Sequence, residues 1–363
     1  MIPLSVTGRD RYLVHHCCVC SKGENAVSIV RAGILGATGY TAVELLKILL
    51  RHPLVEVVLA TSRQDHGKPL SEVHPLLAGR TSLQLENFEA AAATKACDVV
   101  FSCLPHAASA TSVQPLVDAG IHVIDFSADY RLNDVATYET WYGGEHPDPT
   151  RVGQVPYGLP ELFADEITNA KLVANPGCFP TSAILPLAPL LLHEQIQPQG
   201  IIVDAKTGVT GAGRTPKQAT LFPECNESIA AYAVGTHRHG PEIRQILSRR
   251  TGVDTDLIFI PHLVPMDRGI LSTIYARPMR GVSAEQVMEC WREFYEGQPF
   301  IRVVDHLPAT KFTSDTNYCD LAARDVEGTL VLIASIDNLG KGASGAAVQN
   351  LNQVMGWDAT LGF

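Results

Sequence analysis

One glycine-rich stretch constrains the fold of this chain more than any other feature. A β-rich run, Ser28 to Leu35, leads into glycines at three-residue intervals, and a helical pattern follows from Ala42 to Leu50. Pro53 marks the end of that helix, and Val55 to Ala60 has the pattern of a second strand. A strand, a tight turn, a helix and a strand form a βαβ unit, whose two strands are parallel. The pattern therefore predicts a parallel α/β sheet.

The same alternation of strand and helix patterns continues to about Cys178. Further buried strands are expected at Val99 to Cys103 and at His122 to Phe126, with helical stretches between them. This alternation predicts a doubly wound, Rossmann-type α/β domain, which we place at residues 28–177. Beyond it, apolar runs are separated by Gly/Pro loops, which indicates an α+β domain with a mixed, largely antiparallel sheet over residues 178–337. The expected later elements are strands at Gly200 to Asp204, Leu257 to Ile260, Ile270 to Arg277 and Leu330 to Ile336, and a helix at Gly345 to Met355.

The glycine-rich turn also indicates what the first domain binds. Side chains are absent where the strand meets the helix, so a pyrophosphate can approach the backbone. The helix N-terminus offers it N–H donors and the positive end of a dipole. An ordinary tight turn is the alternative, but the strand before it and the helix after it are both readable, which favours dinucleotide binding. The residues expected at the dinucleotide are Gly33, Gly36, Ala37, Thr38, Gly39 and Tyr40.

The end of the second strand distinguishes between NAD and NADP. An acidic residue there would hold the 2′-hydroxyl of the ribose, but the sequence reads Ala60-Thr61-Ser62-Arg63. A hydroxyl and a guanidinium suit a 2′-phosphate instead, whereas a solvated loop arginine would have no such role. The sequence therefore favours NADP, with Ser62 and Arg63 as the selecting residues.

A second turn places a cysteine at the start of a helix. Lys171 to Thr181 predicts a strand that ends in an Asn-Pro-Gly turn, with Pro180 in the first turn of the following helix. Cys178 is then at the helix N-terminus, where the dipole lowers a thiol pKa and favours the thiolate. Its turn-forming flanks indicate a nucleophile. A cysteine in an apolar stretch is more often simply buried, which is the interpretation given to Cys97, Cys103 and Cys290.

Two imidazoles that flank a guanidinium lie in one Gly/Pro loop, Gly235 to Glu242. A nucleophilic thiol needs a base and a site for an oxyanion, and His237, Arg238 and His239 could supply both. A lone histidine is usually structural, but this loop holds more polar groups than packing requires. Metal binding is the rival interpretation. A His-x-His pair without a further ligand nearby is weak for zinc, so no metal is expected.

Charge and apolar content exclude some other functions. The net charge of −10 disfavours nucleic acid and anionic membranes as main partners, because both are polyanions, but it allows a small anionic substrate. No apolar run approaches the roughly 20 residues that span a bilayer. Leu185 to Leu192, interrupted by Pro186 and Pro189, is expected to be a buried helix. Nine scattered cysteines indicate reduced thiols in the cytoplasm rather than a disulfide framework.

Residues 1–27 stand apart from this pattern. The cluster from His15 to Cys20 lacks the usual ligand spacing of a zinc site and a second Cys/His pair. The segment has no apolar core of a signal peptide, and its acidic residues make it a poor transit peptide. We expect a poorly ordered leader, and import into an organelle stays open.

Four motifs occur in an order that is known from one enzyme family. They are Gly36 to Thr41, Asn175 to Thr181, Gly235 to His239 and Asn338 to Gly342. Together they resemble the N-acetyl-γ-glutamyl-phosphate reductases of arginine biosynthesis, which belong to the semialdehyde dehydrogenases. The similarity runs from about Val30 to the C-terminus and leaves out residues 1–27. Phe179 replaces the tyrosine that more often follows the family cysteine.

The resemblance implies roles for individual residues. Cys178 would be the nucleophile and His237 the acid/base, and Ser102, Pro105 and Asn338 would contact NADP. The last helix, within residues 338–363, would complete the cofactor domain, while the α+β domain would serve catalysis and oligomerisation as a homodimer or homotetramer. The substrate would be a small anionic acyl phosphate. The implied substrate contacts are Ser127, Arg131, Asn175, Arg214, Arg238, His239 and Glu242.

The implied chemistry is a reduction through a thioester. Cys178 attacks the acyl phosphate, phosphate leaves, and hydride from NADPH reduces the thioester carbonyl. The hemithioacetal then collapses to N-acetylglutamate 5-semialdehyde while His237 manages the protons. Three alternatives remain. A reductase of carrier-linked aminoadipyl phosphate in lysine biosynthesis shares the motifs. Aspartate-semialdehyde dehydrogenase shares the logic but not the sequence around the cysteine. An NADP-sensing binding protein would have no use for Cys178 with His237.

Overall fold

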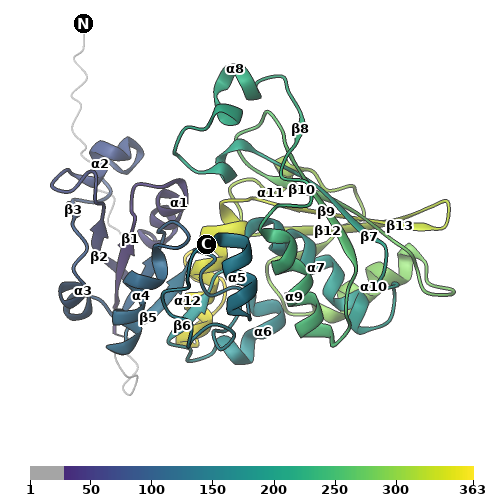
Figure 1. Cartoon of the computed structure of the whole chain (residues 1–363), viewed down its shortest axis with the longest axis horizontal. Helices are drawn as coiled ribbons and strands as arrows, with labels where there is room; N and C mark the ends of the chain where they lie inside the picture. Colours follow the sequence, from purple (N-terminus) through teal and green to yellow (C-terminus); the bar gives the residue numbers. More distant parts are fainter. Residues whose placement is uncertain (1–27) are drawn as a thin grey trace, which may run out of the picture.

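The computed structural model describes residues 28–363, in which two β-sheets lie side by side (Figure 1). The first sheet has six strands in the order β3-β2-β1-β4-β5-β6, and all neighbouring strands are parallel. This order is that of a Rossmann fold, so the predicted doubly wound sheet is confirmed. Its strands are β1 (Val30–Leu35), β2 (Val55–Thr61), β3 (Leu85–Glu86), β4 (Val99–Ser102), β5 (His122–Asp125) and β6 (Leu172–Ala174).

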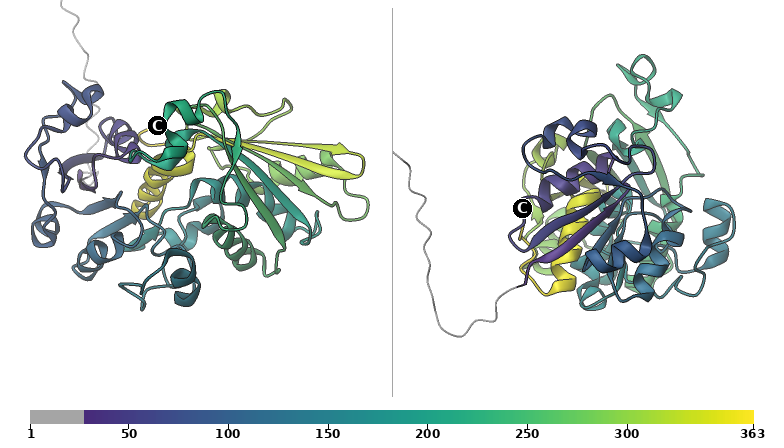
Figure 2. Two further views of the ribbon diagram at one scale, coloured as in Figure 1. Left: turned by 45° about the horizontal axis from the view of Figure 1, so that its top comes forward. Right: turned by 90° about the vertical axis from the view of Figure 1, so that its left-hand side faces the viewer.

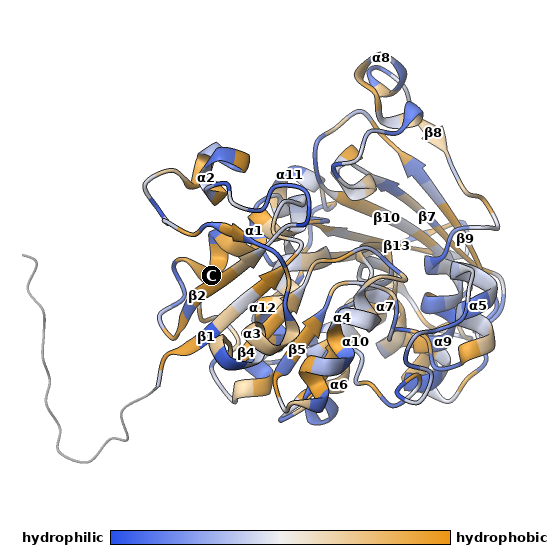
Figure 3. Ribbon diagram, turned by 60° about the vertical axis from the view of Figure 1, so that its left-hand side comes forward, coloured by the Kyte–Doolittle hydropathy of each residue, from blue (hydrophilic) through white to orange (hydrophobic). Residues whose placement is uncertain are grey.

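Helices cover both faces of the first sheet, because alternate strand residues point to opposite faces. Ala32 and Ile34 of β1 pack with α1 and with α12 (Gly345–Met355), a helix near the C-terminus. Leu35 and Val100 pack with α3 and α4 on the other face. Two buried faces explain why these strands are rich in apolar residues, and Figure 3 shows much of β1 in orange. The helices of this part are α1 (Tyr40–Leu49), α2 (Leu70–Val73), α3 (Ala90–Ala96), α4 (Ser109–Asp118), α5 (Val135–Tyr142) and α6 (Pro160–Ile167).

The second sheet has seven strands in the order β11-β12-β13-β10-β7-β9-β8. Four neighbouring pairs are antiparallel and two are parallel, which confirms the mixed, largely antiparallel sheet. Strands β7 and β9 extend three residues beyond the apolar runs that predicted them, because half-exposed residues alternate with buried ones there. The strands are β7 (Ile201–Thr207), β8 (Ala230–Ala231), β9 (Leu257–Leu263), β10 (Ile270–Ala276), β11 (Ile301–Val303), β12 (Cys319–Val326) and β13 (Thr329–Ile336).

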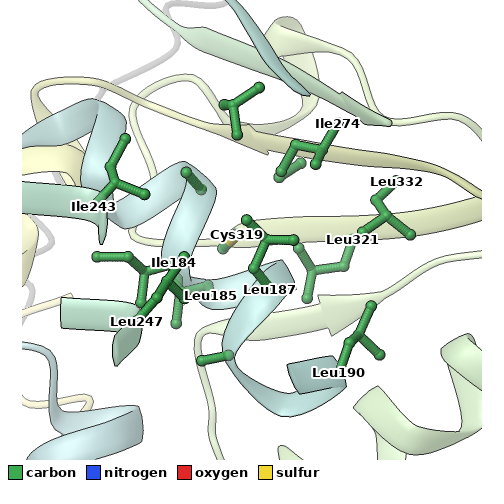
Figure 4. Close-up of a cluster of buried hydrophobic side chains, with 14 of the residues drawn as sticks. Ile184, Leu185, Leu187, Leu190, Ile243, Leu247, Ile274, Cys319, Leu321 and Leu332 are labelled. Atoms are coloured by element: carbon green, nitrogen blue, oxygen red, sulfur yellow. The ribbon is translucent and has the colours of Figure 1, made fainter. Parts of the chain in front are cut away.

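Helix α7 (Cys178–Leu192) is the buried centre of this second half. Its apolar side chains, among them Ile184 and Leu187, lie between α9 and the strands β10, β12 and β13 (Figure 4). Pro189 has no N–H for the carbonyl of Leu185, and the buried hydroxyl of Tyr295 donates to that carbonyl at 2.6 Å instead. The expectation of a buried helix here is confirmed. The other helices are α8 (Phe222–Cys225), α9 (His239–Thr251), α10 (Ala284–Phe294) and α11 (Thr310–Thr313).

The end of the chain returns to the first sheet. A π-helical turn, Gly340–Ser344, leads into α12 (Gly345–Met355). Ala347, Val348 and Leu351 of α12 belong to the same apolar cluster as α1. Figure 2 shows the yellow helix α12 beside the purple helix α1. The first sheet therefore obtains part of its core from the last residues of the chain.

Candidate active site

The glycine turn between β1 and α1 forms one end of the main cavity. Gly36 has a positive φ of 74°, and a Cβ there would lie 2.9 Å from the carbonyl oxygen of Cys103, so only glycine fits. Gly39 is the N-cap of α1, and a Cβ there would meet nothing closer than 3.9 Å. The start of α1 therefore faces open space that a phosphate can enter, which fits a dinucleotide. Gly33, in contrast, lies inside β1 and packs against Cys97.

This cavity has a volume of about 1490 Å³ and is lined by residues from both halves of the chain. It exceeds the roughly 300–1,000 Å³ of a usual ligand pocket, so it has room for a dinucleotide and a small second ligand. Thr38, Gly39 and Tyr40 line it, while Ala37 is buried behind them. The loop after β2, the start of α7 and the loop with the two imidazoles also form parts of the wall.

Cys178 is the first residue of α7, and it lines the cavity half-buried. A Cβ on Gly342 would lie 2.8 Å from the Cys178 Cβ, so the Gly340–Ser344 turn packs directly against this residue. Burial raises the pKa of the Cys178 thiol to about 11, although the Arg131 guanidinium and the N–H of Phe179 act in the opposite direction. The expected thiolate is therefore not the resting form, because loss of solvation outweighs the helix N-terminus.

The two imidazoles lie together on the cavity wall, with ring centroids 4.8 Å apart. The N–H of His239 donates to Nδ1 of His237 at 3.1 Å, so a neutral His237 ring carries its own proton on Nε2. Burial lowers the pKa of His237 to about 4 and that of His239 well below its usual value, so both rings are neutral near neutral pH. A Cβ on Gly177 would lie 2.6 Å from Nε2 of His239, so His239 borders the turn that precedes Cys178.

Arg131 and Glu242 anchor that turn. Arg131 lines the cavity, and its Nε donates to the carbonyl of Asn175 at 2.7 Å. The buried carboxylate of Glu242 accepts hydrogen bonds from the N–H of Gly177 at 2.9 Å and from the hydroxyl of Tyr157 at 2.7 Å. Its second oxygen lies 3.5 Å from Arg131. Because the protein engages both carboxylate oxygens, Glu242 stands behind the cavity wall and holds the turn in place.

Asn338, Pro105 and Asn175 line the cavity, as do Arg238 and Arg214. The side chain of Asn338 is fixed at both ends. Its Oδ1 accepts the N–H of Gly269 at 2.7 Å, and its Nδ2 donates to the hydroxyl of Thr210 at 3.0 Å. The guanidinium of Arg238 lies 5.0 Å from the centre of the Tyr142 ring.

Ser102 and Ser127 are placed in a buried network around Asp125, away from the cavity wall. The Ser127 hydroxyl donates to Asp125 at 2.6 Å. The Ser102 hydroxyl shares a hydrogen bond of 2.7 Å with Ser109, which in turn donates to Asp125 at 2.6 Å. These hydroxyls brace the ends of β4 and β5, where the cavity begins.

At the end of β2 the expected selecting residues also stand off the wall. The hydroxyl of Ser62 accepts the N–H of Asp65 at 3.1 Å, and Arg63 is exposed. Gln64, Asp65 and Lys68 of the same loop line the cavity. Lys68 pairs with Asp65 at 2.8 Å. The loop thus brings a second cation, which the sequence pattern did not single out, to the place expected for the 2′-phosphate.

Sequence reasoning also missed His106, Lys217 and Tyr232, which line the cavity. Burial and the charges of Arg131 and Arg238 lower the pKa of His106 to about 3. Lys217 could have been predicted, because it follows Arg214 by three residues and Arg214 was already expected at the substrate. His106 and Tyr232 lie in stretches without a pattern of their own.

Residues 28–363 contain no group of three or more His, Cys, Asp and Glu side chains placed to hold a metal ion. No helix of that range is long and apolar enough to cross a membrane. Its six cysteines are free. Cys97 is buried as expected, but Cys103 and Cys290 are only half-buried, because Cys103 borders the cavity and Cys290 a surface groove. The expected leader and its His15 to Cys20 cluster lie outside the described residues.

Two family models match most of the chain. Residues 31–170 match the model described as semialdehyde dehydrogenase, NAD binding domain, and residues 178–338 match the semialdehyde dehydrogenase dimerisation domain. Among curated proteins, the N-acetyl-γ-glutamyl-phosphate reductase of Rhodopirellula baltica is 54% identical over 92% of this chain and 98% of that protein. The reductase of the same name from Citrifermentans bemidjiense is 48% identical over the same shares.

Solved structures share the fold at much lower identity. Aspartate semialdehyde dehydrogenase II from Vibrio cholerae, complexed with ASA, matches with a TM-score of 0.70 and 17% identity over 90% of this chain and 98% of that one. An aspartate semialdehyde dehydrogenase with NADP from Candida albicans matches with a TM-score of 0.69 and 18% identity over the same shares. These TM-scores show that both share the overall fold of this chain.

Proposed function

The chain belongs to the N-acetyl-γ-glutamyl-phosphate reductase family of semialdehyde dehydrogenases, and from this premise we propose how its residues carry out the reaction. The enzyme uses NADPH to reduce N-acetyl-γ-glutamyl phosphate to N-acetylglutamate 5-semialdehyde and phosphate, in arginine biosynthesis. The observation that supports this most is one cavity that holds the start of α1, Cys178 and His237 together. A dinucleotide, a nucleophile and a proton carrier then meet at one place.

The substrate is tested by comparing acyl phosphates. NADPH oxidation should be fast with N-acetylglutamyl phosphate and far slower with aspartyl phosphate or carrier-linked aminoadipyl phosphate. Identities of 46–54% to reductases of this name, against 17–18% to the aspartate enzymes, favour this order. Equal rates with aspartyl phosphate would contradict the assignment, and no turnover with any of the three would favour an NADP-sensing protein.

Cys178 supplies the nucleophile. Its sulfur bonds to the acyl carbon, the bond from that carbon to the phosphate oxygen breaks, and phosphate leaves with the electron pair. NADPH, when bound, supplies the hydride that reduces the resulting thioester carbonyl. The carbon–sulfur bond then breaks, and Cys178 returns to its thiol form as the aldehyde leaves. The α7 N-terminus and the Arg131 guanidinium stabilise negative charge on the sulfur at both stages.

His237 transfers protons to the substrate oxygen and from the Cys178 thiol. Its Nε2–H is available to the substrate oxygen as negative charge develops there. To take the thiol proton at Nε2, the ring must first carry its proton on Nδ1, which ends the contact with the N–H of His239. His239, Arg131 and Arg238 are the substrate contacts that the cavity supports best. Glu242 acts by positioning Gly177 and therefore Cys178.

We further propose that residues 28–177 with 338–363 bind the cofactor, and that residues 178–337 bind the substrate and form the oligomer. The start of α1 would hold the pyrophosphate, and Asn338 would lie at the nicotinamide. The match to a dimerisation domain supports a homo-oligomer, which we expect to be a homodimer or homotetramer. Free cysteines among the described residues support the cytoplasm as its location.

Arg63→Ala tests the choice of cofactor. We expect kcat/KM with NADPH to fall by roughly ten- to a hundredfold, because a charged hydrogen bond to the 2′-phosphate is lost, and NADH use to change little. Arg80→Ala, an exposed arginine away from the cavity, is the control. Equal losses with both cofactors would contradict the 2′-phosphate role. A selective loss in Lys68→Ala alone would assign that role to the lysine on the cavity wall.

A further inference from the structure

A guanidinium from the second half of the chain reaches the glycine turn of the first. Nη1 of Arg214 donates to the carbonyl oxygen of Thr38 at 3.0 Å, and both residues line the main cavity. Burial and, to a smaller extent, the charge of Arg214 lower the pKa of His74. Nε2 of His74 lies 3.0 Å from the carbonyl of Ala37. The hydrogen bond to Thr38 and the effect on the His74 pKa both show that the positive charge of Arg214 lies at the turn.

The turn that Arg214 reaches has no cation of its own. The sequence from Gly33 to Val43 contains neither lysine nor arginine. The basic residue of α1, Lys47, pairs with Glu44 at 2.8 Å. A helix N-terminus contributes only about half an elementary charge, whereas a pyrophosphate bridge carries a negative charge on each phosphate. A guanidinium, with five N–H donors in a planar fork, suits such oxygens best.

The segment that carries Arg214 is also fixed near the other end of the proposed cofactor site. The N–H and the hydroxyl of Thr210 donate to the carbonyl of Asp267 at 3.1 and 2.7 Å. Nδ2 of Asn338 donates to the same hydroxyl at 3.0 Å. Asn338, proposed at the nicotinamide, is therefore hydrogen-bonded to the segment that carries Arg214 to the glycine turn. Both line the same cavity.

We propose that Arg214 binds the pyrophosphate of the cofactor rather than the acyl-phosphate substrate that the resemblance implied. Within residues 28–363 the guanidinium makes one hydrogen bond, to Thr38, so its other N–H donors remain for phosphate oxygens. The proposal rests on the proposed function, since it requires a dinucleotide at α1. It adds a side chain from the substrate half of the molecule to the cofactor site, and so couples the two sites through residues 210–214.

The test is the dissociation constant of the free cofactor, measured without substrate by nicotinamide fluorescence or calorimetry. Arg214→Ala should weaken NADPH and NADH alike, each by roughly tenfold or more, because both contain the pyrophosphate. Arg63→Ala should weaken NADPH alone. Arg214→Lys keeps the charge but not the fork and should recover part of the loss. Arg280→Ala, exposed and away from the cavity, should leave both constants unchanged.

Unchanged dissociation constants in Arg214→Ala, with a raised KM for the acyl phosphate, would overturn the proposal and return Arg214 to the substrate. A loss for NADPH alone would overturn it as well and assign Arg214 to the 2′-phosphate. Because Arg214 is exposed, its replacement leaves folding intact, which a thermal melt checks. The wild-type measurement distinguishes failure of the Arg214 proposal from failure of the proposed function. If the wild type binds neither cofactor, the proposed function itself fails.

Discussion

Cys178→Ser should reduce turnover by at least roughly ten-thousandfold, as loss of a catalytic nucleophile does in other covalent enzymes. A serine hydroxyl ionises far less readily than a thiol, and the imidazoles beside it are neutral and weakly basic. The variant should also lose iodoacetamide labelling at this position. Steady-state NADPH oxidation and mass spectrometry of the trapped thioester measure the two effects.

Cys290→Ser is the matched control, because Cys290 is also half-buried but borders a different groove. This variant should keep full activity. Turnover of Cys178→Ser near the wild-type rate would mean that no thioester forms and that hydride reaches the acyl phosphate directly. The pH dependence gives a second check. The thiol pKa is raised to about 11, so below this value the thiolate is the minor form. The rate of wild-type labelling should therefore increase about tenfold for each unit by which the pH rises toward 11.

His237→Asn should lower kcat by roughly a hundredfold to ten-thousandfold, the usual contribution of general acid/base catalysis. Labelling of Cys178 should persist at raised pH, where hydroxide removes the thiol proton without the imidazole. In the wild type the lowered pKa of about 4 keeps this ring neutral above that pH. The rate should therefore fall only as the pH drops toward 4, where the ring becomes charged and can no longer take a proton.

His239→Asn is the comparison that decides between the two imidazoles. If His239 contacts the substrate, its loss should act mainly on KM. A loss of kcat in His239→Asn together with a nearly normal His237→Asn would mean that the roles are exchanged. The hydrogen bond from the His239 N–H to Nδ1 of His237 is made by the backbone, so asparagine at position 239 preserves it.

Local features of this site could be predicted from the sequence because each depends on a few adjacent residues. The turn at Gly36 and Gly39 and the start of α7 at Cys178 are of this kind. The ionisation of Cys178 could not be predicted, since burial is decided by residues far along the chain, such as Gly342 packed on its Cβ. For the same reason, no local pattern shows that Glu242 accepts the N–H of Gly177.

The predicted and observed positions of site residues also differ for serine hydroxyl groups. A serine next to a strand end has the same sequence signature whether it faces a ligand or a buried carboxylate. Ser127 donates to Asp125, and that partner is visible only in three dimensions. Arginines gave a mixed result. The resemblance implied that Arg131, Arg214 and Arg238 contact the substrate, and all three line the cavity. Arg63, predicted at the 2′-phosphate from its place after the second strand, is exposed and does not line it.

The return of α12 to the first sheet determines when this protein can finish folding during its synthesis. The strands of that sheet leave the ribosome early, yet the apolar face beside α1 stays open until Ala347, Val348 and Leu351 emerge. Gly342, which packs against Cys178, also arrives late. A nascent chain thus exposes hydrophobic surface through most of its translation, the kind of surface that chaperones bind. A translation product interrupted before residue 342 would lack both the α12 part of this core and the turn that packs against Cys178.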